Sequence, residues 1–301
     1  MYSAVLFGAS AFAMVLILAI IVELYLQSRL SIHTFGASFF TRSEWDPVQQ
    51  VYSAKAFVLG TLYTSFWALL IAVPVSIGAA VFLAEVAPKW IRTPLGFLIE
   101  LLAAIPSVVY GLWGIFVLVP WLAKHVETPI SESKTWGSFF LFNAAPNGND
   151  FLAASLVLAI MIIPIITGIA RDILRAVPNT MREGSYALGA TKWETIRRVV
   201  LPRARAGMIG AVMLGLGRAL GETMAVTMVI GNNPDFNLAL FSPGTTLASI
   251  VANEFTEATL DLYRSALMEI GFSLLVIALV VNGAARLLVR WSSRSAEGRR
   301  T

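Results

Sequence analysis

Six long apolar segments alternate with polar stretches along the chain, at about residues 4–26, 57–86, 95–122, 151–169, 207–230 and 265–289. A helix that crosses a bilayer needs roughly 20 mainly apolar residues, and each segment reaches or approaches that length. The pattern therefore predicts an all-α membrane protein with six transmembrane helices. No tandem repeat or low-complexity tract interrupts the series, so residues 1–301 are expected to form a single transmembrane domain.

The apolar segments also predict where the helices depart from straight rods. The second and third segments are longer than a bilayer requires, so tilt or irregular ends are expected. Pro74, Pro106 and Pro164 fall inside spans, where neighbouring helices can satisfy the freed carbonyl groups. The first segment lacks a basic leader and a clear cleavage site, so we interpret it as a retained span rather than a signal peptide.

The amino-acid composition excludes several classes of protein. Hydrophobic residues make up 57% of the chain and charged residues only 13%, with a mean hydropathy of +0.75. A soluble domain is about one quarter charged, so lipid is the expected solvent. The chain has no cysteine and only two histidines, His33 and His125. A disulfide framework is therefore excluded, no metal site is expected, and a membrane enzyme ranks last among the candidate functions.

Basic residues are distributed unevenly between the two sides that six spans define. Fifteen of the 22 lysines and arginines fall in the 87–94 loop, the 170–206 loop and the C-terminal tail, six fall on the opposite side, and Arg218 lies within a span. Loops rich in lysine and arginine face the cytoplasm, so both termini are expected there. One local signal disagrees, because residues 1–3 carry no charged side chain while Arg29 follows the first span.

The 170–206 loop contains more structural signals than a simple connection requires. Gly189 stands where a short helix would need a left-handed terminator, and Pro202 is expected to end a second one. The loop is thus predicted to form two short helices joined by a glycine turn. On physical grounds alone, helices that lie on the membrane surface and helices that dock a partner are equally well supported. Two sequences match a capping box, with a threonine followed three residues later by a glutamate: Thr180 with Glu183, and Thr191 with Glu194.

The same loop resembles the EAA motif of the permease subunits of ABC importers. Gly184 and Ser185 replace the two alanines of that motif and Val199 replaces an isoleucine, whereas the spacing is kept throughout. The resemblance implies that residues 179–202 form a coupling element that sits in a cleft of an ATPase. The matching positions are Glu183, Gly184, Ser185, Gly189, Val199, Leu201 and Pro202.

The glycines of this loop also have the spacing of a nucleotide-binding P-loop, from Gly184 to Gly189 and on to Thr191. The lysine that reaches the nucleotide phosphates is missing, so the loop is not one. The chain is therefore expected to be a transport subunit rather than an enzyme and to bind no cofactor itself. ATP and magnesium would bind to a partner ATPase.

A charged pair lies in the fifth apolar segment. Arg218 and Glu222 are four residues apart, which on one helix places them on the same face. An arginine at mid-bilayer costs about 2.5 to 3.5 kcal/mol and usually faces a bundle interior or a water-filled path. We interpret Arg218 as a contact for a passing anion and Glu222 as the residue that moderates its affinity. The alternative is an ion pair that only holds helices together.

Two segments within the spans resemble the permease subunits of the bacterial phosphate-specific importer, PstC-type more than PstA-type. They are residues 217–226, GRALGETMAV, and residues 105–114, IPSVVYGLWG. The resemblance implies the type I ABC importer fold and a location in the bacterial inner membrane. It also implies three kinds of partner: a second, PstA-type permease subunit, two copies of an ATP-binding subunit and an extracytoplasmic phosphate-binding protein.

Alternative functions and the roles of several further residues remain open at this point. An ABC permease for another oxyanion, such as molybdate or sulfate, would share the coupling motif, and a stand-alone secondary transporter would explain the buried charges but not the loop. Glu100 and Glu269 are expected to be interfacial or paired with a neighbour. Further positions are expected to be solvated or to serve packing: His33, His125, Ser107, Gly111 and Gly114.

Overall fold

A computed structural model describes residues 2–133, 136–137 and 139–297 of the chain. Helices and short turns make up this part, apart from two isolated bridges that pair Asp46 with Val51 and Gly231 with Gly244. The α-helices are α1 Tyr2–Phe35, α2 Ser38–Thr41, α3 Lys55–Val81, α4 Lys89–Ala104, α5 Ser107–Trp113, α6 Val119–Leu122, α7 Thr128–Ser131, α8 Phe151–Arg175, α9 Asn179–Ala187, α10 Lys192–Thr195, α11 Leu201–Leu220, α12 Met224–Val229, α13 Leu247–Glu254 and α14 Asp261–Glu297.

Four π-helical segments continue these helices: η1 Phe82–Val86, η2 Gly114–Leu118, η3 Ala123–Glu127 and η4 Ile196–Val200. With them included, six helices within the described residues are long and apolar enough to cross a membrane, which confirms the predicted all-α class. They are Leu6–Phe35, Lys55–Val86, Ser107–Ser131, Phe151–Arg175, Lys192–Leu220 and Asp261–Ala284.

Helix α8 is the centre of the bundle. In its most apolar stretch of 18 residues, 61% of the residues are buried, whereas the corresponding share in the other five candidate spans is at most 28%. Its closest partner is α3, which presents small and hydroxyl-bearing residues to it. Ser76 donates a hydrogen bond to the Ile163 carbonyl at 3.3 Å, and Thr167 donates one to the Ser76 carbonyl at 3.4 Å. Small residues and such hydroxyl bonds are how helices associate in lipid, where no hydrophobic effect drives them together.

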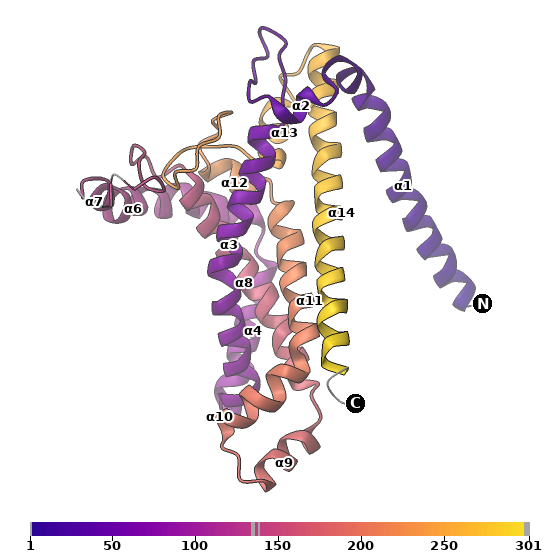
Figure 1. The fold of residues 1–301 in the computed structure, drawn as a ribbon, viewed down its shortest axis with the longest axis vertical. Helices are drawn as coiled ribbons and strands as arrows, with labels where there is room; N and C mark the ends of the chain where they lie inside the picture. Colours follow the sequence, from indigo (N-terminus) through magenta and orange to yellow (C-terminus); the bar gives the residue numbers. More distant parts are fainter. Residues whose placement is uncertain (1, 134–135, 138, 298–301) are drawn as a thin grey trace.

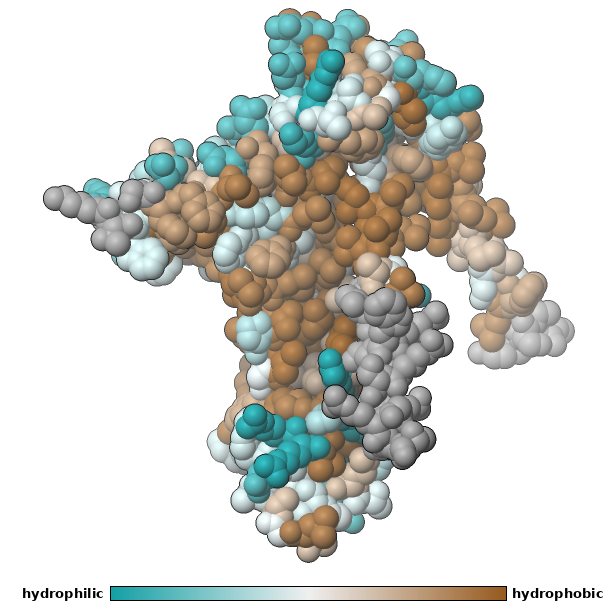
Figure 2. All heavy atoms as spheres, viewed as in Figure 1, coloured by the Kyte–Doolittle hydropathy of each residue, from teal (hydrophilic) through white to brown (hydrophobic). Residues whose placement is uncertain are grey.

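The bundle is elongated, with different elements at its two ends (Figure 1). Helices α9 and α10 lie at one end and α2 and α13 at the other, while α1 diverges from the body. Figure 2 shows an apolar belt between more polar ends, as expected for a chain that spans a bilayer. Large apolar side chains exposed on the described part of the chain include Phe66, Phe97 and Phe116. Met1 and residues 298–301 of the predicted domain lie outside the described residues.

Two predicted spans are broken. The third was predicted to run from 95 to 122, but α4 ends at Ala104 and a new helix begins at Ser107. Pro106, which has no N–H to donate, stands at the break. Beyond it the chain leaves the bundle axis, and α6 and α7 project to one side. The fifth span was predicted to run continuously from 207 to 230, but α11 ends at Leu220 and α12 begins at Met224.

The end of the bundle opposite α9 and α10 has a second core, made of aromatic side chains. Trp45 donates a hydrogen bond from its indole nitrogen to Glu254 at 2.8 Å, and Tyr263 donates one to the same carboxylate oxygen. This core ties the segment between α2 and α3 to α13 and α14. Helix α13 begins with a capping box formed by Thr246 and Ser249. The cluster comprises Phe39, Trp45, Tyr52, Phe57 and Tyr263.

Candidate functional site

Arg218 lies in the last turn of α11, immediately before the break in the fifth span. A cation is favoured at this end of a helix, where the dipole is negative. Its Nη2 atom is 3.8 Å from Glu222 Oε2, an ion-pair distance too long for a hydrogen bond. The Arg218 side chain is 40% exposed and that of Glu222 only 7%. The pair therefore forms as predicted, and at 3.8 Å it leaves the guanidinium donors without a hydrogen bond from Glu222, so that they are available to another ligand.

Glu222 does not continue the helix that carries Arg218, contrary to the prediction of one helical face. Residues 221–223 are non-helical, and Glu222 Oε1 accepts a hydrogen bond from the Ala225 amide at 3.4 Å, at the start of α12. The carboxylate thus faces the arginine on one side and the first turn of the next helix on the other. Gly221, with no side chain, is the residue at which α11 ends.

The two broken helices pack against each other. A Cβ atom on Gly111 of α5 would lie 3.1 Å from the Ala225 backbone and 2.5 Å from Met228 Sδ, and one on Gly114 would lie 2.8 Å from Val229. The absence of these atoms lets α5 and α12 approach closely, as predicted for packing glycines. The break after α4 and the break after α11 are thereby held side by side.

Tyr110 is a residue of this region that the sequence did not single out. Its hydroxyl donates a hydrogen bond to the Leu102 carbonyl at 2.9 Å, across the Pro106 break. It also lies within electrostatic range of Arg218. Discontinuous helices that meet near mid-membrane are a recurrent way to build an ion or anion site in transporters. Ser107, at the start of α5, is half-buried.

The second candidate region is the loop between α8 and α11. The capping box of Thr191 and Glu194 is confirmed at the start of α10. That of Thr180 and Glu183 is wrong, because α9 begins at Asn179, after Pro178, with no side-chain cap. Proline fixes its own backbone at a helix entry, so the helix starts two residues earlier than a threonine cap at position 180 would place it.

Gly189 is the left-handed terminator that the sequence predicted. Its φ is +82°, and its amide donates a hydrogen bond to the Tyr186 carbonyl at 2.9 Å. The prediction that Pro202 ends the second helix is wrong. The π-helical turn η4 precedes it and Pro202 lies in the first turn of α11, so helix runs unbroken from Lys192 to Leu220. Pro202 has no N–H to donate to the preceding turn, and the π-helical η4, closed by a bond from the Leu201 amide to the Ile196 carbonyl, lies directly before it.

The exposed face of this loop is apolar where a loop needing only solvent would be polar. Leu188 is 90% exposed, Trp193 61% and Tyr186 44%. Ser185 is tied inward by a 2.9 Å hydrogen bond between its hydroxyl and that of Thr195. The exposed positions of the motif are Glu183, Gly184, Gly189 and Pro202, whereas Ser185, Val199 and Leu201 are half-buried.

Comparison with known proteins identifies the family. The family described as "Binding-protein-dependent transport system inner membrane component" matches residues 76–294, which include α8, the 170–206 loop and both helix breaks. The chain belongs to this family. With six helices capable of spanning a membrane, this permease is a multi-pass protein of the inner membrane.

Relatives of this permease include two phosphate transport system permease proteins PstC. That of Pasteurella multocida is 49% identical over 282 residues, covering 92% of this chain and 87% of the relative. That of Haemophilus influenzae is 48% identical over 277 residues, covering 91% and 88%.

Solved structures share the fold of the permease at low sequence identity. A chain of a bacterial alginate ABC transporter, in complex with an alginate-bound periplasmic protein, has a TM-score of 0.62 at 15% identity, with 95% of this chain and 94% of that chain covered. A chain of the MetNI methionine ABC transporter has a TM-score of 0.54 at 19% identity, with 77% and 91% covered. The ABC importer permease fold predicted from the motif is confirmed.

A buried ion pair ties the motif loop of the permease to the bundle. Arg182 of α9 donates to both carboxylate oxygens of Glu85 in η1, at 2.7 and 3.3 Å. The two side chains are 13% and 8% exposed. Arg182 also donates to the Leu174 carbonyl at the end of α8, at 2.8 Å. The sequence did not indicate this contact, because its partners are 97 residues apart.

The structure also shows the surroundings of the remaining candidate residues. Glu100 pairs with Arg171, as one of the predicted alternatives held. The expectation for Glu269 is wrong, because it is buried at 3% exposure in α14 and, within the described residues, no lysine or arginine lies within ion-pair distance of it. His125 stacks on Trp121 at the surface of η3. Within the described residues, no group of three or more His, Cys, Asp or Glu side chains could hold a metal ion.

Proposed function

We propose that the chain is the PstC-type permease subunit of an ATP-driven phosphate importer. The observation that carries the proposal is the 48–49% identity to PstC proteins over nine tenths of the chain. The relatives are phosphate transport proteins by name, which favours phosphate over molybdate or sulfate as the oxyanion. The coupling motif counts against a stand-alone secondary transporter.

In this proposal the meeting point of the two broken helices is half of the translocation path, with Arg218 as the anion contact. A guanidinium offers paired N–H donors that match the geometry of phosphate oxygens and stays charged at physiological pH. Its 3.8 Å ion pair with Glu222 leaves those donors available. The carboxylate nearby weakens anion binding, and a transport site must release as well as bind.

Residues 179–202 would couple this path to a separate ATPase. The exposed apolar residues Leu188, Trp193 and Tyr186 form a surface for a protein partner. The buried Arg182–Glu85 pair would pass movement of that surface to α3 and α8. The chain itself would bind no cofactor, with ATP and magnesium held by the partner.

The complete transporter would then contain a second permease subunit of the PstA type, two copies of an ATP-binding subunit and an extracytoplasmic phosphate-binding protein. Both termini and the 170–206 loop would face the cytoplasm, as the lysine and arginine distribution predicts. The chain has no cysteine, so a single cysteine placed in the 27–56 loop or the 179–202 segment can test this orientation by labelling from either side.

The proposal is tested with Arg218→Gln in the whole importer, reconstituted in vesicles. Removal of the charge is expected to abolish phosphate uptake while all subunits still co-purify. Arg42→Gln removes one exposed arginine from an external loop and serves as the control. Normal uptake by Arg218→Gln would reduce Arg218 to a packing residue. Uptake of molybdate or sulfate in place of phosphate by the unmodified importer would reassign the substrate.

A further inference from the structure

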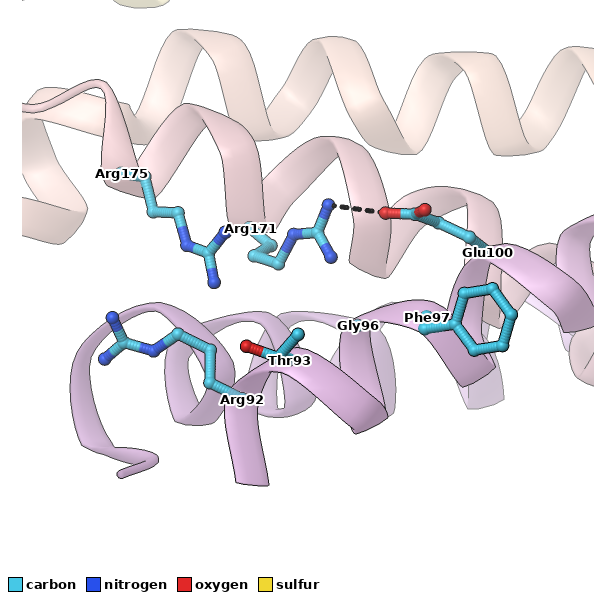
Figure 3. Close-up of a pocket in the computed structure, with 7 residues that line it drawn as sticks. All are labelled: Arg92, Thr93, Gly96, Phe97, Glu100, Arg171 and Arg175. Atoms are coloured by element: carbon cyan, nitrogen blue, oxygen red, sulfur yellow. Dashed lines mark hydrogen bonds and ion pairs between the residues drawn. The ribbon is translucent and has the colours of Figure 1, made fainter. Parts of the chain in front are cut away.

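Three arginines from two helices surround a cavity that the path and the coupling element do not use. The cavity lies between α4 and the end of α8 and has a volume of about 580 Å³. In Figure 3 the side chains of Arg171 and Arg175 extend from α8 toward α4, on which Arg92 lies. The rest of the lining is Thr93, Gly96, Phe97 and Glu100.

Only part of this positive charge is compensated within the described residues. Arg171 is 11% exposed and binds Glu100 at 3.1 Å and Asp172 at 2.9 Å. Arg92 donates to the Ala87 carbonyl at 3.1 Å, and its buried Nε has no hydrogen-bond partner. No carboxylate in the described part lies within ion-pair distance of Arg92 or Arg175.

The simplest alternative is that these arginines have no ligand and only follow the rule that loops rich in lysine and arginine face the cytoplasm. It suits Arg171 and Arg175, which lie in the last turns of α8, where the helix dipole favours a cation. It does not suit Arg92, which lies near the start of α4. The helix dipole disfavours a cation at that end, and the first turn of α4 contains no acidic residue. Like charges gathered around a partly buried hollow repel one another unless an anion lies between them.

The shape of α4 fits the arrangement. A Cβ atom on Gly96 would lie 2.8 Å from Arg171 Nη1, so the missing side chain is what lets the guanidinium reach across α4. The exposed Phe97 beside it is 61% accessible and gives the cavity an apolar wall. The cavity thus combines guanidinium donors, one threonine hydroxyl, an apolar edge and one carboxylate, Glu100, which is paired with Arg171.

We propose that this cavity binds a phosphoryl group, held by Arg92 and Arg175 with Arg171 at the back. Planar guanidinium groups bind phosphate oxygens through paired hydrogen bonds. The group could be free inorganic phosphate or the phosphate of an anionic lipid headgroup, because both present the same oxygens. The site is separate from Arg218 and does not depend on the function proposed above.

The test compares Arg92→Gln/Arg175→Gln with Arg203→Gln/Arg205→Gln in the membrane complex of the importer, purified without the phosphate-binding protein, which would itself bind the labelled phosphate. Both pairs remove two exposed or half-exposed positive charges on the same predicted side, but Arg203 and Arg205 do not line the cavity. Each complex also carries Arg218→Gln, so that phosphate bound in the path does not contribute. Binding of radiolabelled phosphate is measured in nanodiscs of zwitterionic lipid, and retained lipid is identified by native mass spectrometry after extraction from membranes containing phosphatidylglycerol and cardiolipin. Thermal unfolding of every sample reports folding.

Free phosphate is the ligand if the cavity variant lowers phosphate affinity by about tenfold or more while the control stays within about twofold. A lipid phosphate is the ligand if the cavity variant loses the co-purified anionic lipid and the control retains it. The proposal is overturned if correctly folded cavity and control variants show the same phosphate binding and the same retained lipid. The role of Arg218 in the translocation path is decided by phosphate uptake of the Arg218→Gln importer, without the cavity substitutions. The cavity proposal is decided by binding, so either proposal can fail while the other stands.

Discussion

Two arginines of this protein have opposite surroundings, and the contrast separates their roles. Arg182 is nearly buried, makes two contacts with Glu85 and binds backbone carbonyls as well. Arg218 is 40% exposed and reaches its carboxylate only at 3.8 Å. A fully bonded guanidinium fixes structure, whereas a loosely paired one can exchange partners.

The loose pair gives a prediction for Glu222. In Glu222→Gln the side chain keeps its size and its contact with the Ala225 amide but loses its charge. We expect the importer to hold phosphate more tightly and release it more slowly, so KM and maximal uptake both fall. Initial rates over a range of phosphate concentrations measure both quantities, and unchanged kinetics would contradict the moderating role.

Gly189 and Gly184 form a matched pair for substitution. A Cβ atom on either would meet open space, but only Gly189 has a positive φ, +82°. Gly189→Ala is expected to destabilise the loop by roughly 1 kcal/mol and to lower the yield of ATPase that co-purifies. Gly184→Ala lies inside α9 and is expected to be neutral or slightly stabilising. Equal ATPase recovery from both variants would argue against the docking role.

At the level of elements, the motif loop and the fifth span are one continuous structure. Helix runs from Lys192 through η4 into α11, and Pro202 is accommodated at its start. The loop is therefore not a flexible connection between two spans. Its first helix, α9, is held separately by the Arg182–Glu85 pair.

This ion pair predicts a characteristic pattern of stability. Arg182→Met or Glu85→Leu alone leaves a buried charge without its partner, which costs about 3–5 kcal/mol. The double variant leaves none and is expected to recover much of that loss in thermal unfolding. In both single variants and in the double variant, we expect ATP hydrolysis to remain poorly coupled to transport, so that ATP is hydrolysed without phosphate uptake. Normal uptake by the double variant would show that the pair serves stability alone.

The sequence predicted the elements better than their interruptions. Hydrophobic runs identified the helices because lipid exposure imposes apolar length, and Gly189 could be predicted because its backbone conformation is nearly specific to glycine. The break at Gly221 was missed because the four-residue spacing of Arg218 and Glu222 is also what a continuous helix would give. The Arg182–Glu85 pair and the arginine cavity join residues distant in sequence, and no local pattern records such contacts.

At the scale of the whole molecule, a buried pair of acids holds together the two ends of the connection formed by residues 128–150. Glu127 and Asp150 are both 0% exposed and their carboxyl groups face each other. Glu127 accepts from the Gly148 amide and Asp150 from the Ala153 amide, both at 2.8 Å. The pair anchors the loop at the start of α8.

The acid pair predicts a pH dependence. Burial raises the pKa of Asp150 above its ordinary 3.8, and the Glu127 carboxyl adds to the rise. The native state thus binds a proton that the unfolded state has released, so anchoring is strongest at low pH and weakens as pH rises through the raised pKa. Proteolysis of the 128–150 loop between pH 5 and 8 measures it. Asp150→Asn keeps the helix cap without titrating and is expected to flatten the profile; an unchanged slope would contradict the assignment.

A further prediction concerns the assembly. Vesicles that contain this chain alone are expected to show no ATP-driven phosphate uptake, because no nucleotide site was identified in its sequence. Addition of the partner permease and ATPase subunits, with binding protein outside, is expected to restore it. Robust uptake by the isolated chain would contradict the subunit assignment.

In the proposed complex with an ATPase, the unbroken helix from the motif loop to Arg218 would act as a lever. Its α11 portion, Leu201–Leu220, is 20 residues long, or about 30 Å at 1.5 Å per residue. A tilt of roughly 10° at the ATPase end would move the other end of a rod of that length by about 5 Å. That displacement exceeds the 3.8 Å between Arg218 and Glu222. A small rotation of the ATPase could therefore part the arginine from its carboxylate and change its hold on an anion without any local signal passing through the loop.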